Sequence, residues 1–146
     1  MGYRKFIATG GIVCILAFGC GTTVSSVELL RISADQYYQG IRWKAFSQAA
    51  ALLPPERRAA FLKAREAERE TFNVLDYEIH SVEFDVKKEN AIVIVDYTWN
   101  RLPSTSLEKS RIQQRWQSSK AGWTLVSQEE LELPAVKQDK TGIDLL

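Results

Sequence analysis

Side chains with reactive or metal-binding chemistry are scarce in this chain of 146 residues. It contains two cysteines and one histidine, His80. A zinc site or a catalytic triad would need partners at close spacing, and neither an H-x-x-x-H nor a C-x-x-C pattern occurs. The composition therefore gives no indication of a metalloenzyme or of a triad hydrolase, and we expect no metal.

An excess of charge of either sign is also missing. The chain has 19 Lys and Arg against 18 Asp and Glu, a formal net charge of +1. Binding of nucleic acid needs a concentrated basic face, which this balance does not indicate. The only Gly-Gly pair, Gly10-Gly11, lies in an apolar N-terminal run rather than in a phosphate-binding loop. We expect neither a nucleic-acid partner nor a cofactor.

The N-terminal segment is the most informative part of the sequence. Arg4 and Lys5 precede an uncharged run of 14 residues, Phe6 to Gly19, and Cys20 follows. A basic start before a short apolar run is typical of a secretory signal. The run is too short for a transmembrane helix, which needs roughly 20 apolar residues.

The end of this run, Leu16-Ala17-Phe18-Gly19-Cys20, resembles the lipobox of bacterial lipoproteins. The resemblance implies signal cleavage after Gly19 and lipidation of Cys20, with diacylglycerol on the sulfur and a further acyl chain such as palmitate on the new amino group. Gly21, rather than Asp, then implies the outer membrane, facing the periplasm. The alternative is an ordinary signal peptide, cut near Gly19 or Gly21, that releases a soluble protein.

Removal of residues 1–19 leaves 127 residues, enough for one domain with its own core. The signal takes two basic residues and no acid with it, so 17 basic and 18 acidic side chains remain, a net charge of −1. With Cys14 removed and Cys20 modified, no internal disulfide can form. We expect a lipidated tether at 20–30, one domain at 31–133 and a flexible tail at 134–146.

Two helices are predicted at the start of the domain. Ser33 is a candidate N-cap with Asp35 in the first turn, and apolar residues then recur at helical spacing up to Leu53. Pro54-Pro55 ends this helix and can begin the next, which we expect from Pro55 to Glu70.

From Phe72 the apolar period changes to two, which predicts strands. We expect them at 74–86, 91–99, 107–118 and 123–130. The first should place Val82, Phe84 and Val86 on one face. The second is the clearest, with one face formed by Ala91, Val93, Val95, Tyr97 and Trp99.

Two helices followed by four antiparallel strands define an α+β domain with a curved sheet. This order, with an aromatic-rich first helix and long strands over about residues 31–130, resembles the NTF2-like superfamily of cone-shaped folds. A cystatin-like domain with one helix and a sheet is the nearby alternative. The superfamily includes enzymes, binders and structural domains, so the fold does not decide the function.

Few residues are candidates for a functional site. Asp96 or His80 could serve as a base in an isomerase-like cone, but Asp96 shares a strand face with Thr98 and is better explained as an outward carboxylate paired with an arginine of the next strand. His80 alternates with Asp76 and Glu78 and is expected to be exposed. Four aromatic residues could line a pocket or fill the core: Trp43, Phe46, Tyr97 and Trp99.

The sequence favours a non-catalytic module that a lipid on Cys20 holds in the bacterial cell envelope, where it docks another envelope protein. The alternative is a small-ligand binder or isomerase-like enzyme that uses the cone pocket, with Asp96 or His80 as the base. The two differ in what the cone should contain. A roomy cone with a carboxylate inside favours the enzyme, and a filled cone favours the interaction module.

Overall fold

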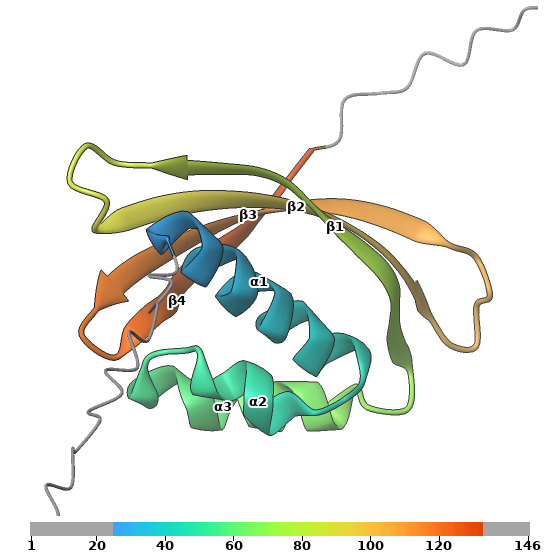
Figure 1. Cartoon of the computed structure of the whole chain (residues 1–146). Coiled ribbons are helices and arrows are strands. Elements are labelled where there is room, and N and C mark those ends of the chain that lie inside the picture. The colour runs from blue at the N-terminus through green and yellow to red at the C-terminus, as the bar shows by residue number, and fades with distance from the viewer. Residues whose placement is uncertain (1–24, 133–146) are drawn as a thin grey trace, which may run out of the picture.

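A computed structural model describes residues 25–132, which form three helices packed on one face of a curved four-stranded sheet (Figure 1). The strands run antiparallel in the order β1-β2-β3-β4. The α+β architecture predicted from the sequence is confirmed, with three helices in place of two. The elements are α1 (Ser26–Arg42), α2 (Phe46–Ala51), α3 (Pro55–Ala67), β1 (Phe72–Phe84), β2 (Asn90–Arg101), β3 (Glu108–Ser119) and β4 (Gly122–Leu131).

Helix α1 begins eight residues before the predicted start. Ser25, not Ser33, is the N-cap, and its Oγ accepts a hydrogen bond from the backbone N–H of Glu28 at 3.1 Å. Ser33 lies inside the helix, where its hydroxyl donates to the carbonyl oxygen of Leu29 at 2.9 Å. Both serines are plausible caps in sequence. The helix therefore extends into the segment that we expected to be tether.

The predicted first helix is also interrupted. Lys44 adopts a left-handed backbone conformation with φ of 57°, which separates α1 from α2. Its Nζ donates to the carbonyl oxygen of Arg69 at the end of the helical region. The turn brings α2 against α1 at Gly40, where an added Cβ would lie 2.9 Å from the Cβ of Ala49. Glycine is needed there for close helix packing.

The sheet places alternate residues on its concave face, against the helices, and on its convex face. The predicted alternation in β2 is confirmed, because Ala91, Val93 and Val95 are buried while Asp96 lies on the opposite face. Val86 was predicted to share the buried face of the first strand. That prediction is wrong, because β1 ends at Phe84 and Val86 is fully exposed.

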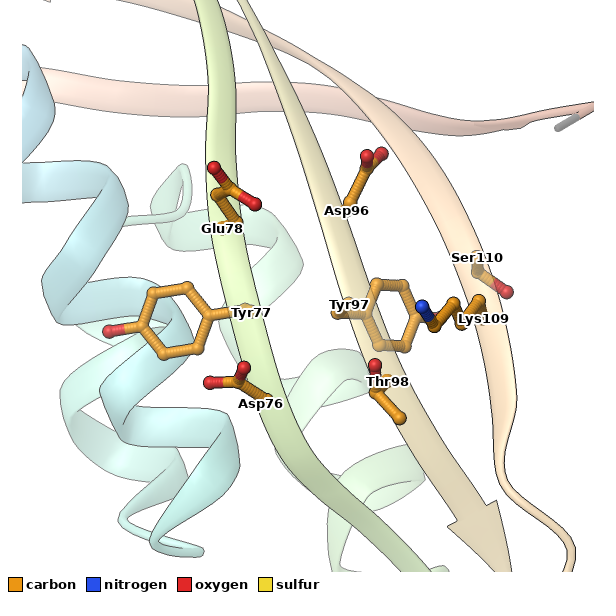
Figure 2. Close-up of a pocket in the computed structure, with 8 residues that line it drawn as sticks. All are labelled: Asp76, Tyr77, Glu78, Asp96, Tyr97, Thr98, Lys109 and Ser110. Carbon is orange, nitrogen blue, oxygen red and sulfur yellow. The ribbon is translucent and has the colours of Figure 1, made fainter. Parts of the chain in front are cut away.

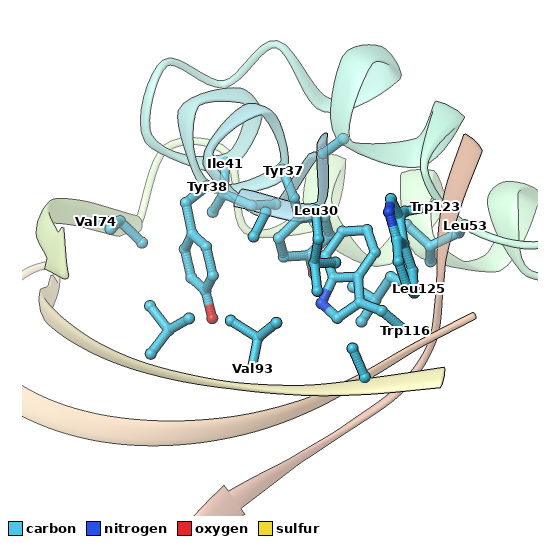
Figure 3. Close-up of a cluster of buried hydrophobic side chains, with 14 of the residues drawn as sticks. Leu30, Tyr37, Tyr38, Ile41, Leu53, Val74, Val93, Trp116, Trp123 and Leu125 are labelled. Carbon is cyan, nitrogen blue, oxygen red and sulfur yellow. The ribbon is translucent and has the colours of Figure 1, made fainter. Parts of the chain in front are cut away.

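The core fills the space between the concave face and the helices (Figure 3). Trp116, Trp123 and Leu125 come from β3 and β4, and they meet Leu30 and Leu53 from the helical layer. Trp116 is only 1 % exposed. Large aromatic side chains supply most of the apolar area that such a core buries.

Both edge strands of the sheet contain β-bulges. The register of β1 against β2 shifts at Leu75 and again at His80, and the register of β4 against β3 shifts at Val126. The carbonyl oxygen of Val126 accepts a hydrogen bond from the guanidinium of Arg57 on α3. Each bulge adds a residue that has no partner in the ladder and bends the strand locally.

Candidate functional site

Asp96 lies in a hollow of about 200 Å³ along the middle of β1, β2 and β3 (Figure 2). The register places Glu78 directly opposite on β1 and Arg111 directly opposite on β3. Arg111 holds the carboxylate with two hydrogen bonds of 2.6 Å, from Nε to Oδ1 and from Nη2 to Oδ2. The predicted pairing with an arginine of the next strand is therefore confirmed.

This ion pair lowers the pKa of Asp96. The hydrogen bonds from Arg111 are the largest cause, and the charges of Arg111, His80 and Lys109 act in the same direction against a smaller effect of burial. A general base that works near neutral pH usually needs a raised pKa and a free lone pair. The pKa of Asp96 is lowered instead, and both of its oxygens accept hydrogen bonds from Arg111, so its environment is suited to holding charge rather than to taking up a proton.

His80 is exposed, as predicted, and occupies the second bulge of β1. Its charge is among the smaller causes that lower the pKa of Asp96. Within residues 25–132, no three His, Cys, Asp or Glu side chains are grouped as metal ligands.

The interior of the cone is a separate and much smaller space. A cavity of about 60 Å³ remains between the helices and the sheet. Pockets for drug-sized ligands usually measure roughly 300–1,000 Å³. No carboxylate is among the described residues that line the cavity, which are Tyr37, Tyr38, Ile41, Arg65, Phe72, Val74, Tyr97, Ile112 and Gln128.

Tyrosines dominate the wall of this cavity. The hydroxyl of Tyr37 donates to Oε1 of Gln128 at 3.1 Å, and burial raises the pKa of Tyr37 to about 12. Burial also raises the pKa of Tyr38, whose ring stacks on Tyr77 with centroids 5.1 Å apart. These hydroxyls stay neutral at physiological pH. Both rings act as packing groups of the core.

The four predicted pocket aromatics do not converge on one site. Tyr97 lines the cone cavity. Phe46 is buried in the core, and Trp99 donates its indole N–H to Oγ of Ser110 at 3.0 Å. Trp43 is 70 % exposed at the end of α1, so its predicted place on a buried helix face is wrong. With 3.6 residues per turn, Trp43 falls on the side of α1 away from the buried Tyr38 and Ile41.

Arg65 and Gln128 also form part of the cavity wall, which the sequence did not predict. In the sequence, Arg65 is one of many charged residues in the segment predicted as the second helix. Its guanidinium instead lies 5.7 Å from the ring centroid of Phe72 and 6.0 Å from that of Phe61. Arg65 reaches the ring of Phe72 only because the chain folds α3 toward the sheet, and no local sequence pattern predicts this contact.

A wider groove of about 720 Å³ lies toward the β1–β2 turn. Glu83, Ile92, Arg115 and Val126 are among its lining residues. The register places Glu83, Ile92 and Arg115 on the convex face, as neighbours across β1, β2 and β3. An apolar floor between an acidic and a basic side chain is a combination that protein surfaces use for recognition.

The predicted signal residues and lipidation site, Gly19 and Cys20, lie outside the described residues, as does the predicted tail at 134–146. Among the helices of residues 25–132, none is both long and apolar enough to cross a membrane.

Comparison with known proteins establishes the fold and no more. No protein-family profile matches the sequence, and no curated protein matches it. Solved structures do match, at low identity.

A domain of unknown function with a cystatin-like fold from Nostoc punctiforme is 15 % identical with a TM-score of 0.62, over 78 % of this chain and 82 % of that one. An NTF2-like protein from Cytophaga hutchinsonii is 9 % identical with a TM-score of 0.60, over 75 % and 100 %. A ketosteroid isomerase-like protein from Erwinia carotovora atroseptica is 15 % identical with a TM-score of 0.53, over 72 % and 95 %. The chain has an NTF2-like α+β fold.

Proposed function

We propose that this protein is a lipid-anchored periplasmic interaction module that docks another protein of the cell envelope and performs no catalysis. The anchor is the acylated Cys20 that the lipobox resemblance implies. Two or three acyl chains hold a protein stably on a bilayer, because each buried CH₂ contributes about 0.8 kcal/mol.

The filled cone is the observation that carries the interaction module over the enzyme. A cavity of about 60 Å³ without a carboxylate offers neither the space nor the base that an isomerase-like reaction requires. The alternative assigned the base to Asp96 or His80. Asp96 is paired with Arg111 on the convex face, and His80 is exposed and does not line the cone cavity.

The convex groove at Ile92 and Arg115 is the surface we assign to the partner. Glu83 and Arg115 lie on opposite sides of Ile92 and present charges of both signs to an incoming protein. Such an arrangement favours one orientation of the partner, because a reversed partner would meet like charges.

The anchor is tested by Cys20→Ser, with Cys14→Ser as the matched control. We expect Cys20→Ser to leave the precursor uncleaved or unlipidated and to release the protein from the outer-membrane fraction. Cys14→Ser should behave as wild type, because Cys14 would be removed with the signal. Mass spectrometry of the mature N-terminus decides the matter, and an unmodified N-terminus at any other residue contradicts the lipoprotein assignment.

The docking surface is tested by crosslinking and affinity purification from detergent-solubilised membranes. Arg115→Glu reverses the charge beside the groove, whereas Lys120→Glu makes the same change in the exposed β3–β4 turn. We expect Arg115→Glu to lose the co-purified protein and Lys120→Glu to retain it. Equal recovery with both variants contradicts docking at the groove.

A further inference from the structure

The solvent-facing side of α1 exposes large apolar side chains in a line. Leu29 is 47 % exposed, Ile32 42 % and Trp43, immediately after the helix, 70 %. With 3.6 residues per turn these three positions and Gln36 fall within about 60° of the helix circumference. We call these four residues the outer α1 face. The same helix buries Leu30, Ala34, Tyr37, Tyr38 and Ile41 on its other sides, and α2 covers Gly40 at the margin of this face through Ala49.

Single exposed apolar residues are ordinary, but an aligned set that includes a tryptophan indicates a contact surface. The indole N–H of Trp43 already donates to Oε1 of Gln39 at 2.7 Å. The ring therefore carries no unpaired donor when it leaves water. The guanidinium of Arg42 lies 5.5 Å from the ring centroid, where it can reach a phosphate beside the ring. Tryptophan beside a cation is typical of the boundary between lipid headgroups and acyl chains.

The short connection to Cys20 limits where this surface can lie. Five residues separate Cys20 from the first residue of α1. Fully extended, the six Cα–Cα steps from Cys20 to Ser26 span at most about 22 Å, less than the length of α1 itself, which is about 25 Å for 17 residues. A lipid on Cys20 would therefore keep the start of α1 close to the bilayer, with Leu29 and Ile32 in its first two turns.

We infer that the outer α1 face rests on the lipid surface, so that α1 lies flat in the membrane interface. This inference rests on the proposed lipid anchor and adds the orientation of the domain to it. Because α1 packs on the concave side of the sheet, the convex face then points away from the membrane, toward a partner in the periplasm (Figure 1).

The charges beside this surface indicate the type of lipid. Glu28, Arg31, Asp35 and Arg42 flank the outer α1 face and their charges sum to zero. Anionic lipid is attracted by clustered basic residues, which this helix does not have. We therefore expect contact with a mainly zwitterionic surface, such as one rich in phosphatidylethanolamine, and little dependence on salt.

The test uses the full lipidated protein, bound to preformed vesicles of phosphatidylethanolamine and phosphatidylglycerol. Gln36→Cys places a single dye-labelled thiol on the outer α1 face. Gln117→Cys places the same dye on the exposed convex face as the matched control. A nitrobenzoxadiazole dye brightens in the membrane interface and is bleached by dithionite in water. The lipidated wild-type protein should take up no dye, because its only retained cysteine is acylated.

We expect the dye in Gln36→Cys to brighten on vesicle binding and to be bleached several-fold more slowly than the dye in Gln117→Cys. A triple variant, Leu29→Ser with Ile32→Ser and Trp43→Ser, should abolish this protection while the protein still floats with the vesicles. Equal bleaching at the two sites in protein that floats overturns the orientation but leaves the anchor intact. Protein that does not float, or whose wild-type form takes up dye, overturns the anchor and the orientation with it.

Discussion

The ion pair between Asp96 and Arg111 gives the most direct test of the conclusion that Asp96 holds a charge rather than taking up a proton. Asp96→Asn removes the negative charge but keeps one carbonyl oxygen that can still accept from Arg111. The side chains are 36 % and 23 % exposed, so water and salt weaken their attraction. Exposed pairs contribute about 0.2–1 kcal/mol, and two hydrogen bonds of good geometry place this pair near the upper end. We expect a loss of about 1 kcal/mol in the free energy of unfolding.

The loss should depend on pH in a defined direction. The pKa of Asp96 lies below its ordinary value of 3.8 in the folded protein, so the folded state favours the ionised form. The stability that this provides is present above pH 3.8 and is lost as the pH falls through the lowered pKa. The difference between wild type and Asp96→Asn should therefore disappear in acid.

Urea unfolding measures this effect, and a slope of roughly 1–3 kcal/mol/M converts 1 kcal/mol into a midpoint shift of about 0.3–1 M. Glu78→Gln is the matched control, because Glu78 lies opposite Asp96 on β1 without sharing its ion pair. Removing one of two facing carboxylates should leave stability unchanged or slightly raised. A loss above about 3 kcal/mol, or one that persists in acid, refutes this account of the pair.

Biological activity gives the second measurement on the same variant. We expect Asp96→Asn and His80→Ala to complement a deletion strain at matched protein level, because neither has the surroundings of a general base. Loss of function by Asp96→Asn in folded protein would place the isomerase-like enzyme ahead of the interaction module.

Three further predictions concern stability. Trp116→Ala should cost about 3–5 kcal/mol and Trp43→Ala less than about 1 kcal/mol, because the first side chain is buried and the second exposed; urea midpoints compare them. Gly40→Ala should cost about 1–3 kcal/mol, since its new Cβ would meet both the Cβ and the backbone nitrogen of Ala49 at 2.9 Å, and thermal unfolding measures the loss. Burial, followed by the hydrogen bond to Asp35, raises the pKa of Tyr77 to about 12, so stability should fall as the pH rises from 10 to 12, and Tyr77→Phe should reduce that fall in a pH series.

The strands could be predicted from the sequence because their signal is local. Ala91, Val93 and Val95 alternate with outward residues, and because side chains two positions apart share one face of a strand, all three must lie on the same face. The position of Asp96 on the opposite face and its pairing with an arginine followed from the same alternation.

The helix ends could not be placed because they depend on tertiary contacts. Ser25 and Ser33 are equally good caps in isolation, and only packing of Leu30 in the core selects the earlier one. The turn at Lys44 uses a left-handed conformation that lysine rarely adopts, so the residue type did not predict the turn. The exposure of Trp43 follows from its position on the side of α1 that faces away from the buried residues.

The bulged edges of the sheet have a consequence for how the protein can associate with other chains. An edge strand with unpaired N–H and C=O groups is a template for aggregation when it is regular and flat. Here the extra residues Leu75 and His80 interrupt β1, and Val126, with its carbonyl already bonded to Arg57, interrupts β4. No long uninterrupted ladder is available for a foreign strand on either edge. The interrupted edges therefore disfavour the joining of neighbouring copies into fibrils through their sheets.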